Sequence, residues 1–73
     1  MSEDAELVRM ANQIADFFQV YPHEEAVAGV AGHIRDFWTY RMREELSAHI
    51  ASGGAGLKPL AIEAMGRLET EAA

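Results

Sequence analysis

The sequence contains no cysteine among its 73 residues, only two prolines, and half as many basic as acidic side chains. A chain without thiols forms no disulfide, thiolate zinc site or iron–sulfur ligation and has no cysteine nucleophile, and it suits a reducing compartment. The formal net charge is −6. Because phosphate binding requires a clustered positive surface, this balance argues against a nucleic-acid partner.

Long hydrophobic runs are also missing. The longest stretch of apolar or glycine residues, 26–32, is far shorter than the ~20 residues of a membrane-spanning helix. Acidic Glu3 and Asp4 stand where a secretory or transit peptide carries basic residues, and no apolar leader segment follows them. We therefore expect a cytoplasmic protein that does not enter a membrane.

Hydrophobic periodicity is helical along the chain. Apolar residues recur three and four positions apart, and no β-branched run alternates with the period of two typical of strands. The predicted fold is all-α, a small bundle or orthogonal array of about four short helices in one domain, 1–73. We expect helices near 3–19, 22–37, 40–52 and 59–70.

Capping residues mark the ends of these helices. Ser2 and Thr39 are candidate N-caps, and Pro22 and Pro59 suit first helical positions, where a missing N–H costs nothing. The glycine-rich stretch before Pro59 has no preceding strand and no Ser or Thr after its lysine, so it is expected to end a helix and not to hold phosphate. Residues 69–73 are expected to fray into an acidic tail.

Two glycines interrupt the helix expected near 22–37. Gly29 and Gly32 each cost the helix ~1 kcal/mol relative to alanine. Such residues usually let a neighbouring helix of the same domain pack closely, and the alternative is a groove that faces a partner. The sequence leaves both interpretations open.

No residue pattern indicates catalysis or a metal centre. The three histidines lack the three- or four-residue spacing that places two imidazoles on one helix face for zinc. His23 is expected to be exposed, His49 to complete a core stripe with a hydrogen-bonded imidazole, and His33 to join a positive patch at a helix C-terminus. We expect no catalytic residue and no directly bound cofactor or metal.

The segment 33–43 differs from its acidic surroundings. It holds three of the six basic residues, the only tryptophan and one of two tyrosines. Aromatic residues and arginine are enriched at binding hot spots. Alternatively, Phe37 and Trp38 fill the core at a helix junction, while the three arginines pair with acids of this chain or of a partner.

Short strings spread over nearly the whole chain have a familiar order. They are 8–15, Phe17-Phe18, 29–31, 33–35, Phe37-Trp38, 41–43, Gly53-Gly54, Gly56-Leu57, Pro59-Leu60 and Glu63-Ala64. Together they resemble the delta subunit of cytosolic NAD-dependent formate dehydrogenases. Where that family usually has Asp-Pro, this chain has Thr39-Tyr40, which keeps an N-cap residue and loses the proline.

The resemblance implies a non-catalytic accessory subunit or assembly factor of a molybdenum or tungsten enzyme that interconverts formate and carbon dioxide. The partner would be the catalytic alpha subunit, which in the family holds the bis-pterin metal cofactor and iron–sulfur clusters. The family's distinctive strings point to a first set of partner-binding residues and a second set. The first comprises His33, Arg35, Trp38, Arg41 and Arg43, and the second Asn12 and Gln13.

Two other classes of function remain open at this point. One is a helical carrier that grips an anionic molybdenum cofactor or a nucleotide with the arginines of segment 33–43. The other is a self-associating helical module, which would form a homodimer when isolated.

Overall fold

The computed structural model describes residues 3–72, and all regular secondary structure in this range is helical. The all-α prediction is confirmed, and each helix begins and ends within two residues of the expected position. The helices are α1 (Glu3–Phe18), α2 (His23–Phe37), α3 (Tyr40–Ala51) and α4 (Pro59–Ala72). No helix in the described part of the chain has the length and apolar character needed to cross a bilayer.

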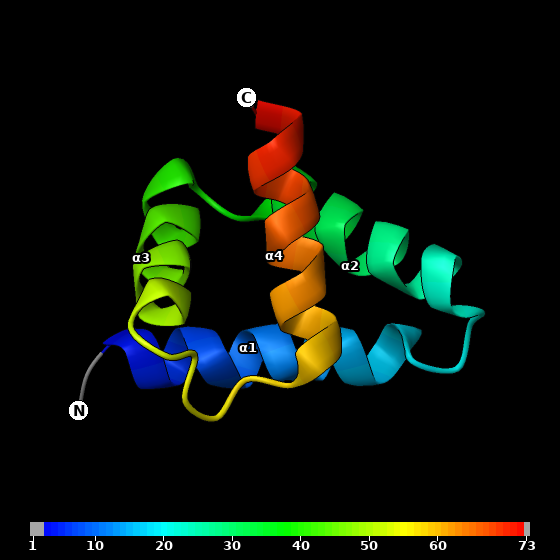
Figure 1. The fold of residues 1–73 in the computed structure, drawn as a ribbon, viewed down its shortest axis with the longest axis horizontal. Helices are drawn as coiled ribbons and strands as arrows, with labels where there is room; N and C mark the ends of the chain where they lie inside the picture. Colours follow the sequence, from blue (N-terminus) through cyan, green and yellow to red (C-terminus); the bar gives the residue numbers. More distant parts are fainter. Residues whose placement is uncertain (1–2, 73) are drawn as a thin grey trace.

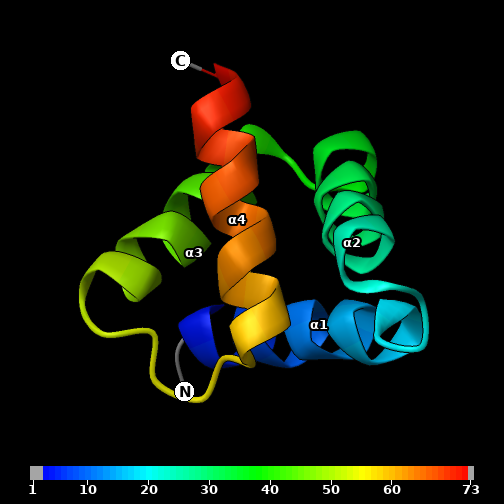
Figure 2. The same ribbon diagram turned by 45° about the vertical axis from the view of Figure 1, so that its right-hand side comes forward.

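The helices form an orthogonal array (Figures 1 and 2). Helix α1 lies across the base and contacts the other three, and α2 returns above it after a short turn. Helix α4 stands across both and packs most extensively on α2. Helix α3 rests chiefly on α1. One face of the α1–α2 pair is therefore covered by α4.

The core forms where these four helices meet. Its largest fully buried side chains come from α2, α3 and α4: Val27, Val30, Ile34, Leu46 and Leu68. Burying a side chain of this kind contributes about 1.5–3 kcal/mol relative to leaving it in water. These residues belong to the apolar stripes of the sequence, so the helical periodicity identified the faces that pack.

The predicted helix starts are largely confirmed. Thr39 caps α3, since its Oγ1 accepts a hydrogen bond from the backbone N–H of Met42 at 3.1 Å. Pro59 is the first residue of α4. Pro22 instead occupies the N-cap position, one residue before α2 begins. The expected Ser2 cap lies outside the described residues.

The expected fraying was wrong for residues 69–72, because α4 continues to Ala72, and Ala73 lies outside the described residues. Two side chains of its last turns are engaged by other helices. Arg35 of α2 donates to Glu71 at 3.1 Å, and Ser47 of α3 donates to Glu69. These contacts join the end of α4 to the array.

The two helical glycines have different surroundings. A Cβ added at Gly29 would overlap Cδ1 and Cε1 of Phe18 and lie 3.0 Å from its Cγ, so the absence of a side chain lets the end of α1 pack on α2. Close packing inside the domain is thereby confirmed for Gly29. A Cβ at Gly32 would meet only the Arg35 side chain, at 3.3 Å, and no neighbouring helix.

Candidate functional site

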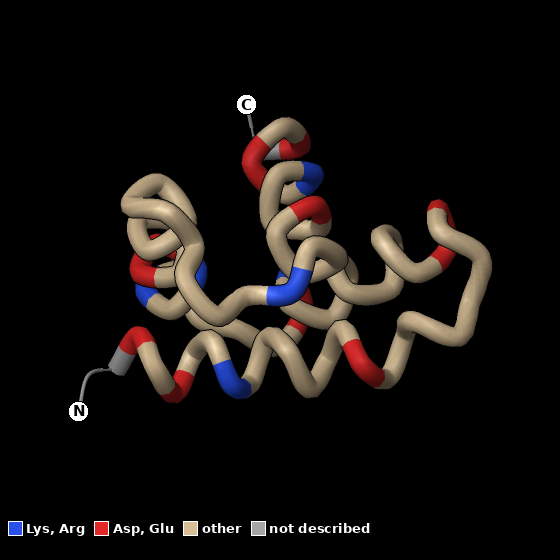
Figure 3. The backbone as a smooth tube through the Cα atoms, turned by 60° about the horizontal axis from the view of Figure 1, so that its bottom comes forward, with Lys and Arg blue, Asp and Glu red and all other residues tan. Residues whose placement is uncertain are grey.

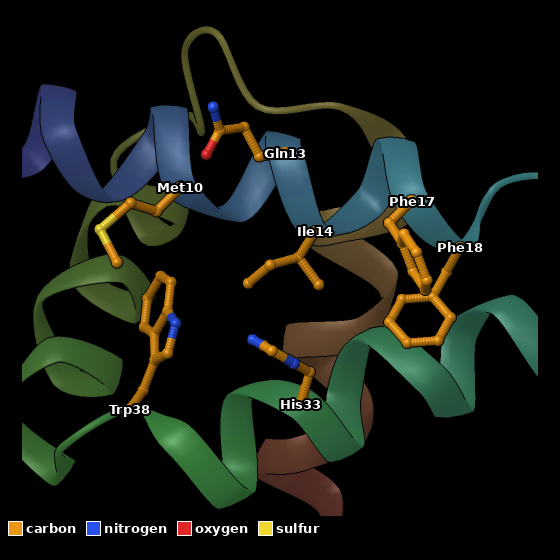
Figure 4. Close-up of a pocket in the computed structure, with 7 residues that line it drawn as sticks. All are labelled: Met10, Gln13, Ile14, Phe17, Phe18, His33 and Trp38. Atoms are coloured by element: carbon orange, nitrogen blue, oxygen red, sulfur yellow. The ribbon is translucent and has the colours of Figure 1, made fainter.

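A surface groove of about 530 Å³ lies between α1 and the C-terminal end of α2. We call it the α1–α2 groove (Figure 4). Five of its lining side chains are apolar and two are polar, Gln13 and His33. Figure 4 shows Met10 and Ile14 from α1 facing Trp38 and His33 across the groove, with the two phenylalanines at one end. The lining residues are Met10, Gln13, Ile14, Phe17, Phe18, His33 and Trp38.

The groove exists because the apolar stripe of α1 is wider than the core can cover. Leu7, Ala11 and Ala15 are buried, with exposed fractions of at most 5%. The lining residues of α1 recur at the same helical spacing on the adjoining side of the helix. They remain open because α4, which packs on α1 and α2, passes behind the groove in Figure 4.

Two phenylalanine rings stand out at this surface. Phe17 is 67% exposed and Phe37, at the end of α2, is 72% exposed. Each ring contacts an aromatic neighbour that lines the groove: Phe17 meets Phe18 edge-on at 5.0 Å between centroids, and Phe37 stacks on His33 at 4.7 Å. Clustered exposed apolar side chains of this kind mark interaction surfaces.

Three of the predicted partner-binding residues line the groove: Gln13, His33 and Trp38. Trp38 also belongs to the core, with only 7% of its surface exposed, so its ring serves as a wall between core and groove. The expectation that Phe37 fills the core was wrong. Phe37 is the last residue of α2, and its ring turns outward onto His33 while the chain continues to Trp38.

Asn12, another of the predicted partner-binding residues, does not line the groove. Its amide Nδ2 donates to the carbonyl of Gly56 at 2.9 Å, and its Oδ1 accepts from the backbone N–H of Lys58 at 3.0 Å. Both groups belong to the loop that leads into α4. Asn12 therefore fixes this loop to α1, and its amide points away from the groove lining.

The three arginines of segment 33–43 do not gather into one patch. Arg35 pairs with Glu71 at 3.1 Å on the α4 side of α2, and Arg41 pairs with Glu45 at 3.1 Å along α3. Arg43 forms no ion pair with any described residue and lines a separate depression beside α4. The structure thus separates the arginines from the His33 and Trp38 side chains with which the sequence analysis grouped them.

Basic side chains elsewhere are also matched with acids of the chain. Lys58 pairs with Asp16, and Arg67 lies 2.8 Å from Glu24. Such exposed pairs contribute about 0–1 kcal/mol each. Figure 3 shows basic and acidic positions distributed over all four helices and the loop before α4. Because acids outnumber bases, local pairing leaves a surface with excess negative charge.

Two other contacts, Arg9 with Glu6 and Tyr40 with Glu44, change the pKa values of the side chains involved. The hydrogen bond from Arg9 lowers the pKa of the Glu6 carboxyl and raises that of the guanidinium. A hydrogen bond to Glu44 raises the pKa of the Tyr40 phenol, since the nearby carboxylate disfavours a phenolate. All three groups are exposed, and none of them lines the groove.

The remaining histidines have structural contacts. His23 lies 2.9 Å from a carboxylate oxygen of Glu63, and both side chains are about half exposed or more. His49 binds the carbonyl of Ala55 at 2.8 Å, so its predicted hydrogen bond is confirmed. Within residues 3–72, no three His, Asp or Glu side chains gather in a way that could hold a metal ion.

Four lining residues, Met10, Ile14, Phe17 and Phe18, were not among the predicted partner-binding residues. They belong to the apolar positions of the helix expected near 3–19. The signal that could have revealed them is the Phe17-Phe18 pair, because adjacent positions on a helix point about 100° apart and one core cannot easily bury both rings.

The chain matches the model of a known protein family. A family model described as the NADH-dependent formate dehydrogenase delta subunit FdsD matches residues 6–65, which includes every residue that lines the α1–α2 groove. No curated protein and no solved structure matches the chain. The matched range covers most of the 73 residues and extends from α1 into α4. The chain therefore belongs to the delta subunit family of NADH-dependent formate dehydrogenases.

Proposed function

We propose that this protein is a non-catalytic accessory subunit or assembly factor that docks on the cofactor-bearing alpha subunit of its formate dehydrogenase through the α1–α2 groove. In this proposal the alpha subunit carries the bis-pterin molybdenum or tungsten cofactor and the iron–sulfur clusters. The complex would be cytoplasmic. The delta subunit would support formation of the active complex.

The observation that carries the proposal is the open apolar groove with its two exposed phenylalanines. Phe17 and Phe37 are each about 70% exposed to water. Covering these apolar side chains with a partner would be favourable, because it removes apolar surface from water. Family membership supplies the context in which such a partner exists, since a delta subunit functions beside other subunits. The arrangement favours protein contact over chemistry, because the groove offers two polar groups and no charged one.

The positions of the arginines give less support to the carrier hypothesis. A carrier for a phosphate-bearing cofactor needs convergent positive charge. Here Arg35 and Arg41 already face carboxylates of the same chain, and Arg43 lines a different depression from Arg41.

Affinity purification of the tagged full-length chain from its native cells tests the proposal. We expect the large alpha subunit to co-purify with molybdenum or tungsten bound, and deletion of the gene to reduce formate oxidation. Reintroducing the gene should restore activity. Recovery of no alpha subunit, together with unchanged formate oxidation after deletion, would refute the docking role.

A further inference from the structure

The shape of the α1–α2 groove restricts what can occupy it. Along α1 its lining residues begin at Met10 and end at Phe18, so the wall is about two helical turns, roughly 12 Å, long. The opposite wall is formed by His33 and Trp38. A groove between two helix-borne walls of this length matches a helix that inserts side chains at spacings of three and four residues.

A small-molecule ligand fits this groove less well than a polypeptide. Ligand sites bury most of the ligand and present several converging polar groups. In this groove the Phe17 ring is itself 67% exposed, and the adjoining Phe37 ring is 72% exposed. The walls therefore cannot enclose a ligand, whereas a protein surface would cover the groove and both rings together.

A second copy of this chain is also a poor occupant. Self-association would bring together two chains that each carry a net charge of −6, and like charges across an interface are unfavourable. A partner with basic groups beside its apolar contact surface avoids that repulsion.

Charge near the groove supports such a basic partner. No Asp, Glu, Lys or Arg side chain lines the groove, but Asp16 and Asp36 directly precede the two exposed rings, Phe17 and Phe37, and Asp16 is already paired with Lys58. The carboxylate of Asp36 is 64% exposed, and its nearest basic atom, Nε of Arg35, is 3.8 Å away. Its negative charge is therefore only weakly compensated within the chain.

We propose that the α1–α2 groove binds an amphipathic helix of the alpha subunit, with an apolar ridge of about two turns flanked by Lys or Arg. This inference rests on the proposed function and names the segment type that docks. The ridge fills the space between Ile14 and Trp38, and a basic flank faces Asp36 beside the exposed Phe37 ring. The His33 imidazole, which has no side-chain hydrogen bond to a described residue, supplies a polar contact for the helix.

The test measures binding of full-length variants to the purified alpha subunit. Phe17→Ser removes an exposed ring from the groove, and Tyr40→Ser is its matched control, because Tyr40 is a similarly exposed aromatic residue, 73% in water, that lies outside the groove lining. We expect Phe17→Ser to weaken binding about tenfold or more and Tyr40→Ser to change it less than about threefold. Circular dichroism should show both variants folded, because neither ring is buried.

Photo-crosslinking identifies the occupant directly. With p-benzoylphenylalanine in place of Phe17, irradiation of the complex should join the chain to one segment of the alpha subunit. Mass spectrometry should place the crosslink in a segment with apolar residues three and four apart and Lys or Arg beside them. Raising the ionic strength should weaken binding, because charge pairs between exposed groups are screened by salt.

Different outcomes separate the two proposals. If the wild-type chain does not bind the alpha subunit, the proposed function fails. If it binds but Phe17→Ser binds as tightly as wild type, the groove is not the docking site. A crosslink to an acidic or extended segment, or to a second copy of the chain, would overturn the helix assignment while leaving the docking role intact.

Discussion

The close contact between Gly29 and Phe18 gives the sharpest test of the fold. A methyl group at position 29 would overlap the Phe18 ring, whereas a methyl group at Gly66 in α4 would meet no atom within 4 Å. Both glycines are inside helices. Replacing either by alanine should therefore give the same gain in helix propensity, and only Gly29→Ala should add a steric conflict.

The expected energies follow from these two effects. Alanine in place of glycine stabilises a helix interior by ~1 kcal/mol, so Gly66→Ala should raise the unfolding free energy by about that amount. At Gly29 the overlap forces the Phe18 ring out of its place or separates α1 from α2, and such overpacking costs about 1–3 kcal/mol. Gly29→Ala should therefore be less stable than Gly66→Ala by about 1–3 kcal/mol. In a domain of this size each kcal/mol shifts Tm by ~4–8 °C.

Urea unfolding followed by circular dichroism measures both variants against wild type. A third and a fourth variant isolate the contact: in a Phe18→Ala background, adding Gly29→Ala should become stabilising by ~1 kcal/mol, since the ring is gone. If Gly29→Ala stabilises wild type as much as Gly66→Ala does, the close packing of α1 on α2 described above is incorrect.

Three further predictions concern other parts of the molecule. Asn12→Ala should lower the unfolding free energy by about 1–3 kcal/mol in urea titrations, because the loop at 56–58 loses its two hydrogen bonds to the Asn12 side chain. A loss below ~0.5 kcal/mol would contradict the role of Asn12 in fixing this loop to α1. Thr39→Ala should cost ~1 kcal/mol through loss of the α3 cap, and Thr39→Ser should recover most of it, which thermal unfolding can check. The Tyr40 phenol should titrate above its ordinary pKa of 10.0 in absorbance at 295 nm, and Glu44→Gln should lower that pKa. Because the pKa of Tyr40 is raised in the folded state, its contact with Glu44 stabilises the fold below pH ~10, and this stabilisation is lost as the pH rises through the raised pKa. If the titration of Tyr40 is the same in Glu44→Gln as in wild type, the contact is absent.

The fold class was predictable from the sequence because helix formation here depends on local features. The period of the apolar residues and a cap such as Thr39 act over one or two turns, and both were visible in the sequence. The end of α4 was less predictable, because it is joined by contacts from α2 and α3 through Glu71 and Glu69. Contacts between distant helices leave no local signal.

The candidate site was predictable only in part for the same reason. Gln13, His33 and Trp38 were named from the sequence and do line the groove. The composition of segment 33–43 could not show that Arg35 faces α4 while His33 faces α1, because neighbouring positions on a helix point in different directions. Asn12 looked like a surface residue until the loop at 56–58 was placed against it.

The sequence by itself determined the helices, the missing thiol chemistry and the family, because these depend on residue identity and on local or ordered spacing. Only the tertiary structure decided which apolar residues are buried in the core and which remain exposed in the groove. The apolar residues of α1 form one continuous stripe in the sequence. Some of them are buried in the core and others line the groove, because α4 covers one side of the α1–α2 pair and leaves the other side exposed. The α1–α2 groove is thus a consequence of how four short helices share one small core.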